Sequence, residues 1–172
     1  GSTKVLKSMN RKYTKEQYLD LVEKMKAKIP NLTLSTDIIV GFAGETEEDF
    51  EDTLDVVRKV VFEQVYMFIY SRRVGTPGDK MENQVPEEIK HKRFDRLKKL
   101  VESQIAENNQ KYIGTIQKVL VEGPSKNNPE MLTGRTDSNK VVIFEGDISL
   151  KDEIVEIEII SEHMWYLKGR KI

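Results

Sequence analysis

The sequence contains no cysteine. This absence excludes disulfide bonds, thiol catalysis and cysteine ligation of zinc or of an iron–sulfur cluster by these 172 residues. Only two histidines are present, His91 and His163, and they lie far apart in the sequence, so a histidine-rich metal site is not expected either. We therefore predict no metal site in this chain.

The chain also lacks a long hydrophobic run and a strong charge of one sign. No segment approaches the roughly 18 apolar residues of a membrane-spanning helix, and no signal-peptide pattern opens the sequence. The 28 Lys and Arg nearly balance the 29 Asp and Glu, for a formal net charge of −1. Bulk charge therefore does not favour a nucleic-acid binder, although a local basic face would suffice. The composition predicts a globular protein of one or two domains with no membrane partner, and it fits a cytoplasmic location.

Hydrophobic periodicity and capping signals predict alternating helices and strands in residues 1–110. Such alternation is typical of parallel strands joined by helices, but two strands are too few for a sheet that stands alone. We therefore expect an α/β unit that is part of a larger barrel or open sheet, or that pairs with another chain. Its exposed edges should self-associate or be covered by the chain itself. The predicted elements are helix 14–29, strand 32–40, a helix from Thr46, strand 64–70 and a helix from Pro86 to about Tyr112.

The pattern changes near residue 111. Short strands with period-two alternation follow one another, separated by turn signals, and five of them within about 60 residues favour a small antiparallel β-barrel, OB-like in type. We therefore predict a second domain over residues 111–172. Its strands are expected at about 115–123, 131–136, 140–146, 153–160 and 162–169.

The stretch TDIIVGFAGETEEDF, residues 36–50, places Gly41 and Gly44 between a strand and an acidic helix start. It is not a P-loop, because the lysine of that motif is missing. It is not a dinucleotide-binding fingerprint either, because the glycines do not have the G-x-G-x-x-G spacing. An acidic first turn would also repel a phosphate. The pattern favours a strand-to-helix turn whose glycines allow close backbone approach, with a ligand beside the turn as the alternative.

Asp37 enters what we predict to be a buried strand, where an unpaired carboxylate would be costly. At a strand end that faces a ligand site, Asp37 could bind the hydroxyls of a ribose while Ile39, on the same side, packs against a base. A hydrogen bond from Asp37 to a neighbouring loop is the alternative. Arg11 could likewise bind a carboxylate in bidentate fashion, or lie in solvent as an ordinary loop arginine.

The sequence of the predicted barrel contains both basic and aromatic residues. This combination suits RNA, through phosphate contacts and base stacking. However, residues 111–172 hold 9 Lys and Arg against 10 Asp and Glu, and the aromatic residues could instead belong to the core. The residues concerned are Lys126, Arg135, Lys140, Lys168 and Arg170, with Phe144, Trp165 and Tyr166.

Four segments together resemble one family, in the same order and over essentially the whole chain. They are STKVLKSMNRKYT (2–14), STDIIVGFAGETEEDF (35–50), FIYSRRVGTP (68–77), and VEGPSK followed by LTGRTDSNKVVIF (121–144). The chain resembles the radical S-adenosylmethionine (SAM) methylthiotransferases. The segment TGRTDSNKVV favours the members that act on tRNA over those that modify a ribosomal protein or threonylcarbamoyl-adenosine.

The resemblance implies part of a radical-SAM (βα) barrel followed by a TRAM domain, a small RNA-binding β-barrel. It implies conversion of N6-isopentenyl-adenosine in the tRNA anticodon stem-loop to its 2-methylthio derivative, with SAM and two 4Fe-4S clusters as cofactors. By the same resemblance, Arg11, Asp37, Ile39 and Gly41 match SAM-binding positions.

Two features depart from the family pattern. The cluster-binding cysteines, which the family carries in a CxxxCxxC loop and in its N-terminal domain, are missing here, so we expect no catalytic residue and no activity from this chain alone. Ala43 also replaces the usual proline of the GFPGET segment. Two other readings stay open from the residues: a non-catalytic RNA-binding module, and an interaction domain without nucleic acid.

Overall fold

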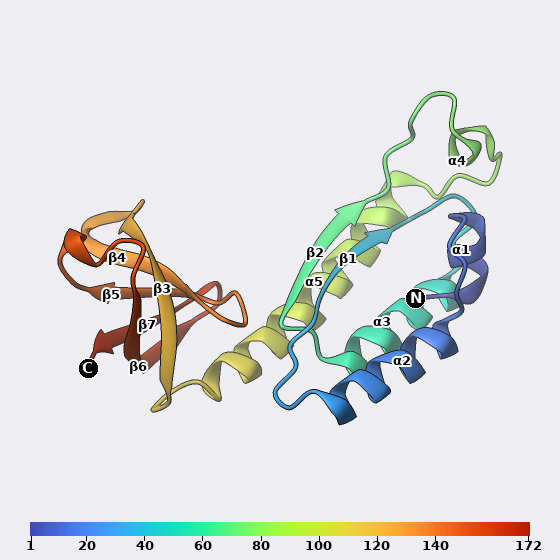
Figure 1. Ribbon diagram of the computed structural model, residues 1–172. Helices are drawn as coiled ribbons and strands as arrows, with labels where there is room; N and C mark the ends of the chain where they lie inside the picture. The colour runs from blue at the N-terminus through green and yellow to red at the C-terminus, as the bar shows by residue number, and fades with distance from the viewer. The chain divides into compact units, whose positions relative to one another are not determined.

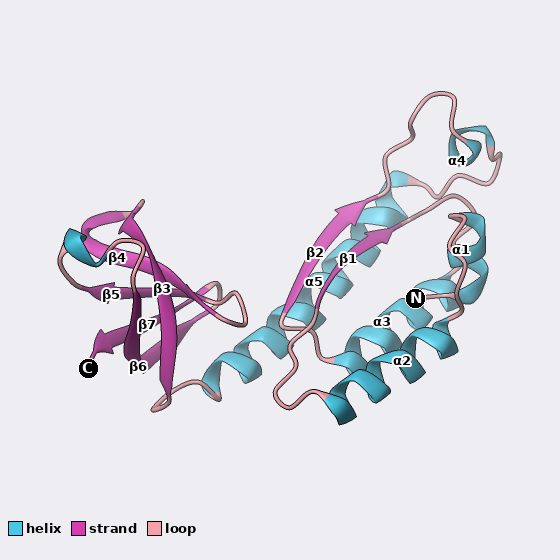
Figure 2. Ribbon diagram, in the orientation of Figure 1, coloured by secondary structure: helices cyan, strands magenta, loops and turns pink.

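The computed structural model describes residues 1–172, which divide into two compact units, residues 1–103 and residues 104–172 (Figure 1). The first unit is α/β and the second is almost entirely β (Figure 2). Helix α5, Glu87–Gln110, crosses the division. No helix is both long and apolar enough to span a membrane.

The first unit contains the helix–strand alternation expected from the sequence, with two short helices that the sequence patterns did not predict. Two predicted capping boxes are present: Thr14 with Gln17 at the start of α2, and Thr46 with Asp49 at the start of α3. The elements before α5 are α1 (Thr3–Ser8), α2 (Lys15–Lys28), β1 (Ser35–Val40), α3 (Glu47–Val60), β2 (Gln64–Ile69) and α4 (Pro77–Lys80).

Strands β1 and β2 form a two-stranded parallel sheet with α3 as the crossover, and neither strand has a further partner. One face of the sheet is covered by the unit's helices, and there Val40 and Val65 are buried. The predicted inward stripe of α3 is confirmed at Phe50, Leu54 and Val57. It is wrong at Val61, which ends α3 in the left-handed conformation and is 40% exposed.

The opposite face of this sheet is open. It carries Asp37 and Ile39 on β1, paired in register with Tyr66 and Phe68 on β2. Ile39, Tyr66 and Phe68 are 38%, 45% and 50% exposed, and Asp37 is exposed as well. The prediction of a buried strand around Asp37 was therefore wrong, because helices cover only one side of the sheet. Asp37 needs no buried partner.

The second unit is a closed five-stranded barrel in the order β3-β4-β5-β7-β6. Every strand pair is antiparallel except β5 with β7, which run parallel. This confirms the small five-stranded barrel expected from the alternation, but the expectation of an antiparallel barrel is wrong for β5 and β7, which are not joined by a hairpin because β6 lies between them in the sequence. The strands are β3 (Ile116–Ser125), β4 (Asn128–Thr136), β5 (Val141–Glu145), β6 (Ile154–His163) and β7 (Tyr166–Lys171), with a 3-10 turn, η1, at Ile148–Leu150.

The barrel interior is filled by every second side chain of its strands. Val119 and Val121 of β3 and Ile157 of β6 are fully buried, whereas Leu120 between the two valines is 48% exposed. Phe144 is fully buried too, so this aromatic residue belongs to the core and not to a surface for RNA.

Strand directions define two ends of the barrel. The β4–β5 and β6–β7 turns lie at the end where β3 begins, and the β3–β4 turn lies at the other end.

Candidate functional site

The glycines of the strand-to-helix turn are explained by close contacts within the protein. Gly41 and Gly44 have positive φ, 76° and 79°, a conformation that side chains other than glycine rarely adopt. A Cβ on Gly41 would lie 2.4 Å from Cγ of Lys90, and one on Gly44 would lie 2.6 Å from Nδ2 of Asn83. The groups beside these glycines are thus side chains from α5 and from the loop before it. No bound ligand is needed to account for them.

A buried ion pair fastens the same turn to α5. The Nη1 atom of Arg93 donates to Oε1 of Glu45 at 2.9 Å and to the Glu45 carbonyl at 3.1 Å. The backbone N–H of Gly41 donates to Oε1 of Glu45 as well, at 2.9 Å. Burial raises the pKa of Glu45, and the Gly41 N–H and Arg93 act in the opposite direction. The turn is therefore held by charge and hydrogen bonds from inside the unit.

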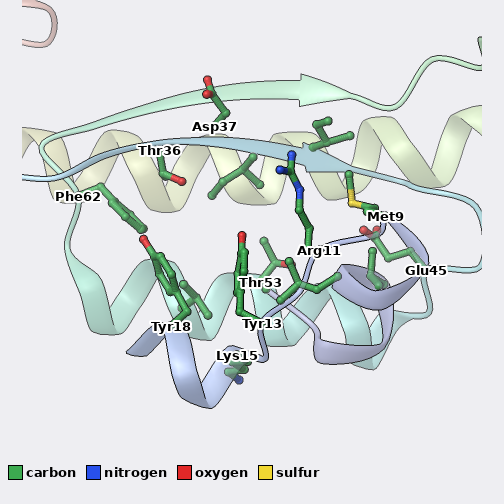
Figure 3. Close-up of a pocket in the computed structure, with 16 residues that line it drawn as sticks. Met9, Arg11, Tyr13, Lys15, Tyr18, Thr36, Asp37, Glu45, Thr53 and Phe62 are labelled. Carbon is green, nitrogen blue, oxygen red and sulfur yellow. The ribbon is translucent and has the colours of Figure 1, made fainter. Parts of the chain in front are cut away.

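A cavity of about 300 Å³ lies between β1 and the first helices (Figure 3). Arg11, Tyr13 and Tyr18 line it and point toward β1, and Thr36 reaches in from the strand. Asp37 points away from these residues, on the other side of β1. Both Arg11 and Asp37 border this cavity, but the Asp37 carboxylate lies on the opposite side of β1 from the Arg11 guanidinium. Asp37 instead shares the open face with Ile39.

A second cavity, of about 670 Å³, lies where β1 and β2 end. Ile39, Phe42, Phe68 and Tyr70 give it an apolar wall, and Arg73 is the cationic group in its lining. The carboxyl ends of parallel strands are the usual place for ligands in α/β folds, and the volume suits a cofactor-sized molecule. Of the predicted SAM-binding residues, Ile39 lines both cavities, Arg11 and Asp37 line the first, and Gly41 lines neither.

The basic residues predicted to bind RNA do not form one group, because Lys126 is separated from the others. Arg135 and Lys140 flank the β4–β5 turn, and Lys168 and Arg170 lie on β7. Lys126 lies in the β3–β4 turn, at the opposite end of the barrel. The barrel therefore separates Lys126 from Arg135 and Lys140.

Several of these cations already have protein partners. Arg135 donates to Glu122 at 3.0 Å, and Arg170 donates to Glu158 at 2.7 Å. The ammonium of Lys140 donates to Oδ1 of Asn109 at 2.6 Å. Lys168 is exposed. Positive charge is thus present on this surface, partly neutralised by neighbouring carboxylates.

Asn109 is a residue that the sequence patterns did not single out. It is 1% exposed, and its Nδ2 donates to the carbonyls of His163, at 2.8 Å, and Met164, at 3.3 Å, in the β6–β7 turn. Its Oδ1 accepts from Lys140. One buried amide therefore joins the end of α5 to both turns at this end of the barrel. A polar residue in the last turn of a helix gives no sequence signal for such a role.

Comparison with known proteins agrees with the two units. Residues 1–57 match the family model of the radical SAM superfamily, and residues 110–172 match that of the TRAM domain. The matching segments therefore lie in the α/β unit and the barrel, respectively.

Curated relatives match the chain from end to end. A tRNA-2-methylthio-N(6)-dimethylallyladenosine synthase of Acetivibrio thermocellus is 54% identical over 169 residues, 98% of this chain and 35% of that protein. Proteins of the same name from Clostridium perfringens (strain SM101 / Type A) and Alkaliphilus oremlandii are each 52% identical, over 98% and 100% of this chain. The chain spans 38% and 36% of their lengths. The family resemblance seen in the sequence is thus confirmed: the chain is related over its whole length to the tRNA-2-methylthio-N(6)-dimethylallyladenosine synthases, with part of a radical SAM domain followed by a TRAM domain.

Proposed function

We propose that this chain supplies the tRNA-binding barrel and part of the SAM-binding barrel of a radical SAM tRNA methylthiotransferase. The reaction is conversion of N6-isopentenyl-adenosine in a tRNA to its 2-methylthio derivative, in the cytoplasm. The observation that carries this proposal is the end-to-end similarity to synthases named for that product, together with a closed barrel that matches the TRAM domain.

The β1–α3–β2 unit is one arc of a (βα) barrel in this proposal. Its strands are parallel, both outer edges of the sheet are unpaired, and the face with Ile39 and Phe68 is open. In a complete barrel, further strands would pair with these edges, and the open face would line the interior. Where such strands are absent, the same edges and face favour self-association.

The two sides of β1 have side chains of the right types for SAM. On the open face, the Asp37 carboxylate would accept hydrogen bonds from the ribose hydroxyls and Ile39 would pack against the adenine, and from the helix side of β1 the Arg11 guanidinium would bind the amino-acid carboxylate. Gly41 lies just beyond the end of β1 and would approach the adenine through its backbone. SAM bound with a reduced 4Fe-4S cluster supplies the radical chemistry.

The chain has no cysteine, so thiolate ligands for two 4Fe-4S clusters would have to come from outside these residues. We therefore expect no turnover from residues 1–172 alone.

The barrel binds the anticodon stem-loop in this proposal. Arg135, Lys140, Lys168 and Arg170 meet the phosphates, and Lys126 makes a separate contact from the other end of the barrel. Phosphate contacts of this kind release counterions, so affinity should fall steeply with salt.

Fluorescence anisotropy of a labelled anticodon stem-loop, titrated with the chain at several salt concentrations, tests the proposal. We expect binding at low salt, with a linear loss of log affinity against log salt. Arg135→Ala and Lys140→Ala should each weaken binding, and Arg58→Ala, an exposed arginine of α3, is the matched control. Failure of the stem-loop to bind at low salt, or binding without salt dependence, would refute tRNA recognition by this chain.

A further inference from the structure

The β6–β7 hairpin turn carries an exposed tryptophan. Trp165 is 61% exposed and is not among the residues of the barrel core or packed against it. An indole ring left in water forgoes the stabilisation that burial of such a large apolar surface would give. The exposed position of Trp165 is therefore better explained by binding at the surface than by a contribution to the stability of the fold.

The turn that presents Trp165 is held firmly from both sides. Nδ2 of the buried Asn109 donates to the carbonyls of His163 and Met164, immediately before Trp165. The rings of His163 and Tyr166 then stack across the hairpin, with centroids 4.4 Å apart and an angle of 16° between their planes. An aromatic side chain on an anchored turn loses little conformational entropy when it binds a ligand.

The strand that leaves this turn is basic. β7 reads YLKGRK and contains Lys168, Arg170 and Lys171 but no acidic residue. Leu167 is fully buried, so the alternating positions Tyr166, Lys168 and Arg170 face outward on one side of the strand. Lys140 is bound to the same Asn109 that holds the turn. Aromatic rings at a turn and a row of cations leading away from it match the two parts of a nucleotide, the base and the phosphate.

We propose that Trp165 is a stacking platform for an unpaired base of the bound RNA, with the adjacent phosphates lying along β7 toward Lys168 and Arg170. This inference rests on the proposed RNA binding by the barrel and adds the kind of RNA that this surface takes. Paired bases are stacked on one another inside a helix and cannot reach the indole. The surface therefore selects single-stranded nucleotides, as in a loop, over duplex RNA.

Trp165 is the only tryptophan of the chain, so its fluorescence reports on this surface alone. We would titrate residues 1–172 with a single-stranded RNA of about ten nucleotides, a length within the usual site size of such barrels. The matched probes are the blunt duplex of the same strand and inorganic polyphosphate. Anisotropy of a label on the RNA measures binding independently of the tryptophan.

The single strand should bind and quench Trp165, whereas polyphosphate should bind without quenching. Trp165→Ala should weaken binding of the single strand by about tenfold, the usual effect of losing one stacked base. The slope of log affinity against log salt should not change, because no phosphate contact is lost. Trp165→Phe should retain most of the affinity. Ile154→Ala removes another exposed apolar side chain, at the opposite end of β6, and should have no effect.

The possible outcomes distinguish failure of the stacking proposal from failure of the proposed RNA binding by the barrel. If the RNA binds but neither quenches Trp165 nor binds more weakly to Trp165→Ala, the barrel recognises RNA elsewhere and the stacking platform is refuted. Equal affinity for the duplex would refute the selection of single strands. If neither the oligonucleotide nor the anticodon stem-loop binds, RNA recognition by the chain is itself refuted.

Discussion

Glu45 and Arg93 form a buried ion pair that joins the β1–α3 turn to α5. Nη1 of Arg93 lies 2.9 Å from Oε1 of Glu45, and the two side chains are 7% and 3% exposed. Removal of one partner from such a pair leaves an uncompensated charge in the interior and is typically far more costly than removal of both.

We predict that Arg93→Met destabilises the first unit by about 3 kcal/mol or more at neutral pH. Burial already raises the pKa of Glu45, and loss of Arg93 removes an opposing influence, so the variant should raise that pKa further. A folded-state pKa above the unfolded value means that stability is lost as pH rises through it. The deficit of Arg93→Met relative to the parent should therefore shrink as pH is lowered toward the range where Glu45 is protonated.

Urea denaturation across a series of pH values measures this effect. Glu45→Gln combined with Arg93→Met should recover part of the stability, because no unpaired charge remains. Arg96→Met removes a half-exposed partner of Glu47 and Glu51 and should cost less than about 1 kcal/mol. A deficit of Arg93→Met that is constant with pH would show that packing, and not the charge of Glu45, sets its size.

The glycine turn gives a second prediction. Gly41→Ala combines an unfavourable positive φ with a Cβ only 2.4 Å from Cγ of the buried Lys90. Gly75→Ala has the same kind of φ, 85°, but its Cβ would meet nothing within 4 Å. We expect Gly75→Ala to cost about 1 kcal/mol from the backbone alone, and Gly41→Ala to cost at least twice as much. Thermal unfolding of both variants measures the difference, and equal costs would mean that Lys90 moves aside freely.

Interactions over a few residues were predictable from the sequence, and those over long separations were not. The capping boxes at Thr14 and Thr46 depend on partners three residues away, and the alternation in β3 depends only on neighbours in the strand. The contact of Gly41 with Lys90 joins residues far apart in the sequence. The open surroundings of Asp37 depend on which side of the sheet the helices cover. Neither the Gly41–Lys90 contact nor the exposure of Asp37 produces a pattern among residues that are close together in the sequence.

The same distinction applies to the candidate sites. Sequence reasoning grouped Lys126 with Lys140 because both are basic residues of one small barrel, but only the strand order shows that they lie at opposite ends. It noted Trp165 as an aromatic residue beside basic ones without deciding between core and surface. The exposure of the indole decides for the surface.

Asn109 provides a third prediction, because its buried amide makes three hydrogen bonds to two turns. Asn109→Ala would remove the acceptor that lies 2.6 Å from the Lys140 ammonium, and the side-chain donor to the carbonyls of His163 and Met164. We expect a loss of about 2–3 kcal/mol in the stability of the barrel.

Hydrogen exchange should also become faster at the β6–β7 turn in Asn109→Ala than elsewhere in the barrel. Asn108→Ala is the control on the same helix: its Oδ1 accepts a hydrogen bond from Lys111 three residues away, so its effect should be smaller. Equal effects of the two variants would show that Asn109 is an ordinary helical residue.

The open sheet of the first unit leads to the last prediction. Both edges of the two-stranded sheet are unpaired, and Ile39, Tyr66 and Phe68 expose apolar surface beside them. Unpaired edges with apolar side chains favour pairing between chains, so we expect residues 1–172 to self-associate with increasing concentration. Phe68→Lys places a charge in the centre of this face and should shift the population toward monomer, whereas Ile160→Lys, an equally exposed position on the barrel, should not. Light scattering over a range of concentrations measures both. A parent chain that is monomeric at every concentration would show that two strands with one covered face are stable on their own.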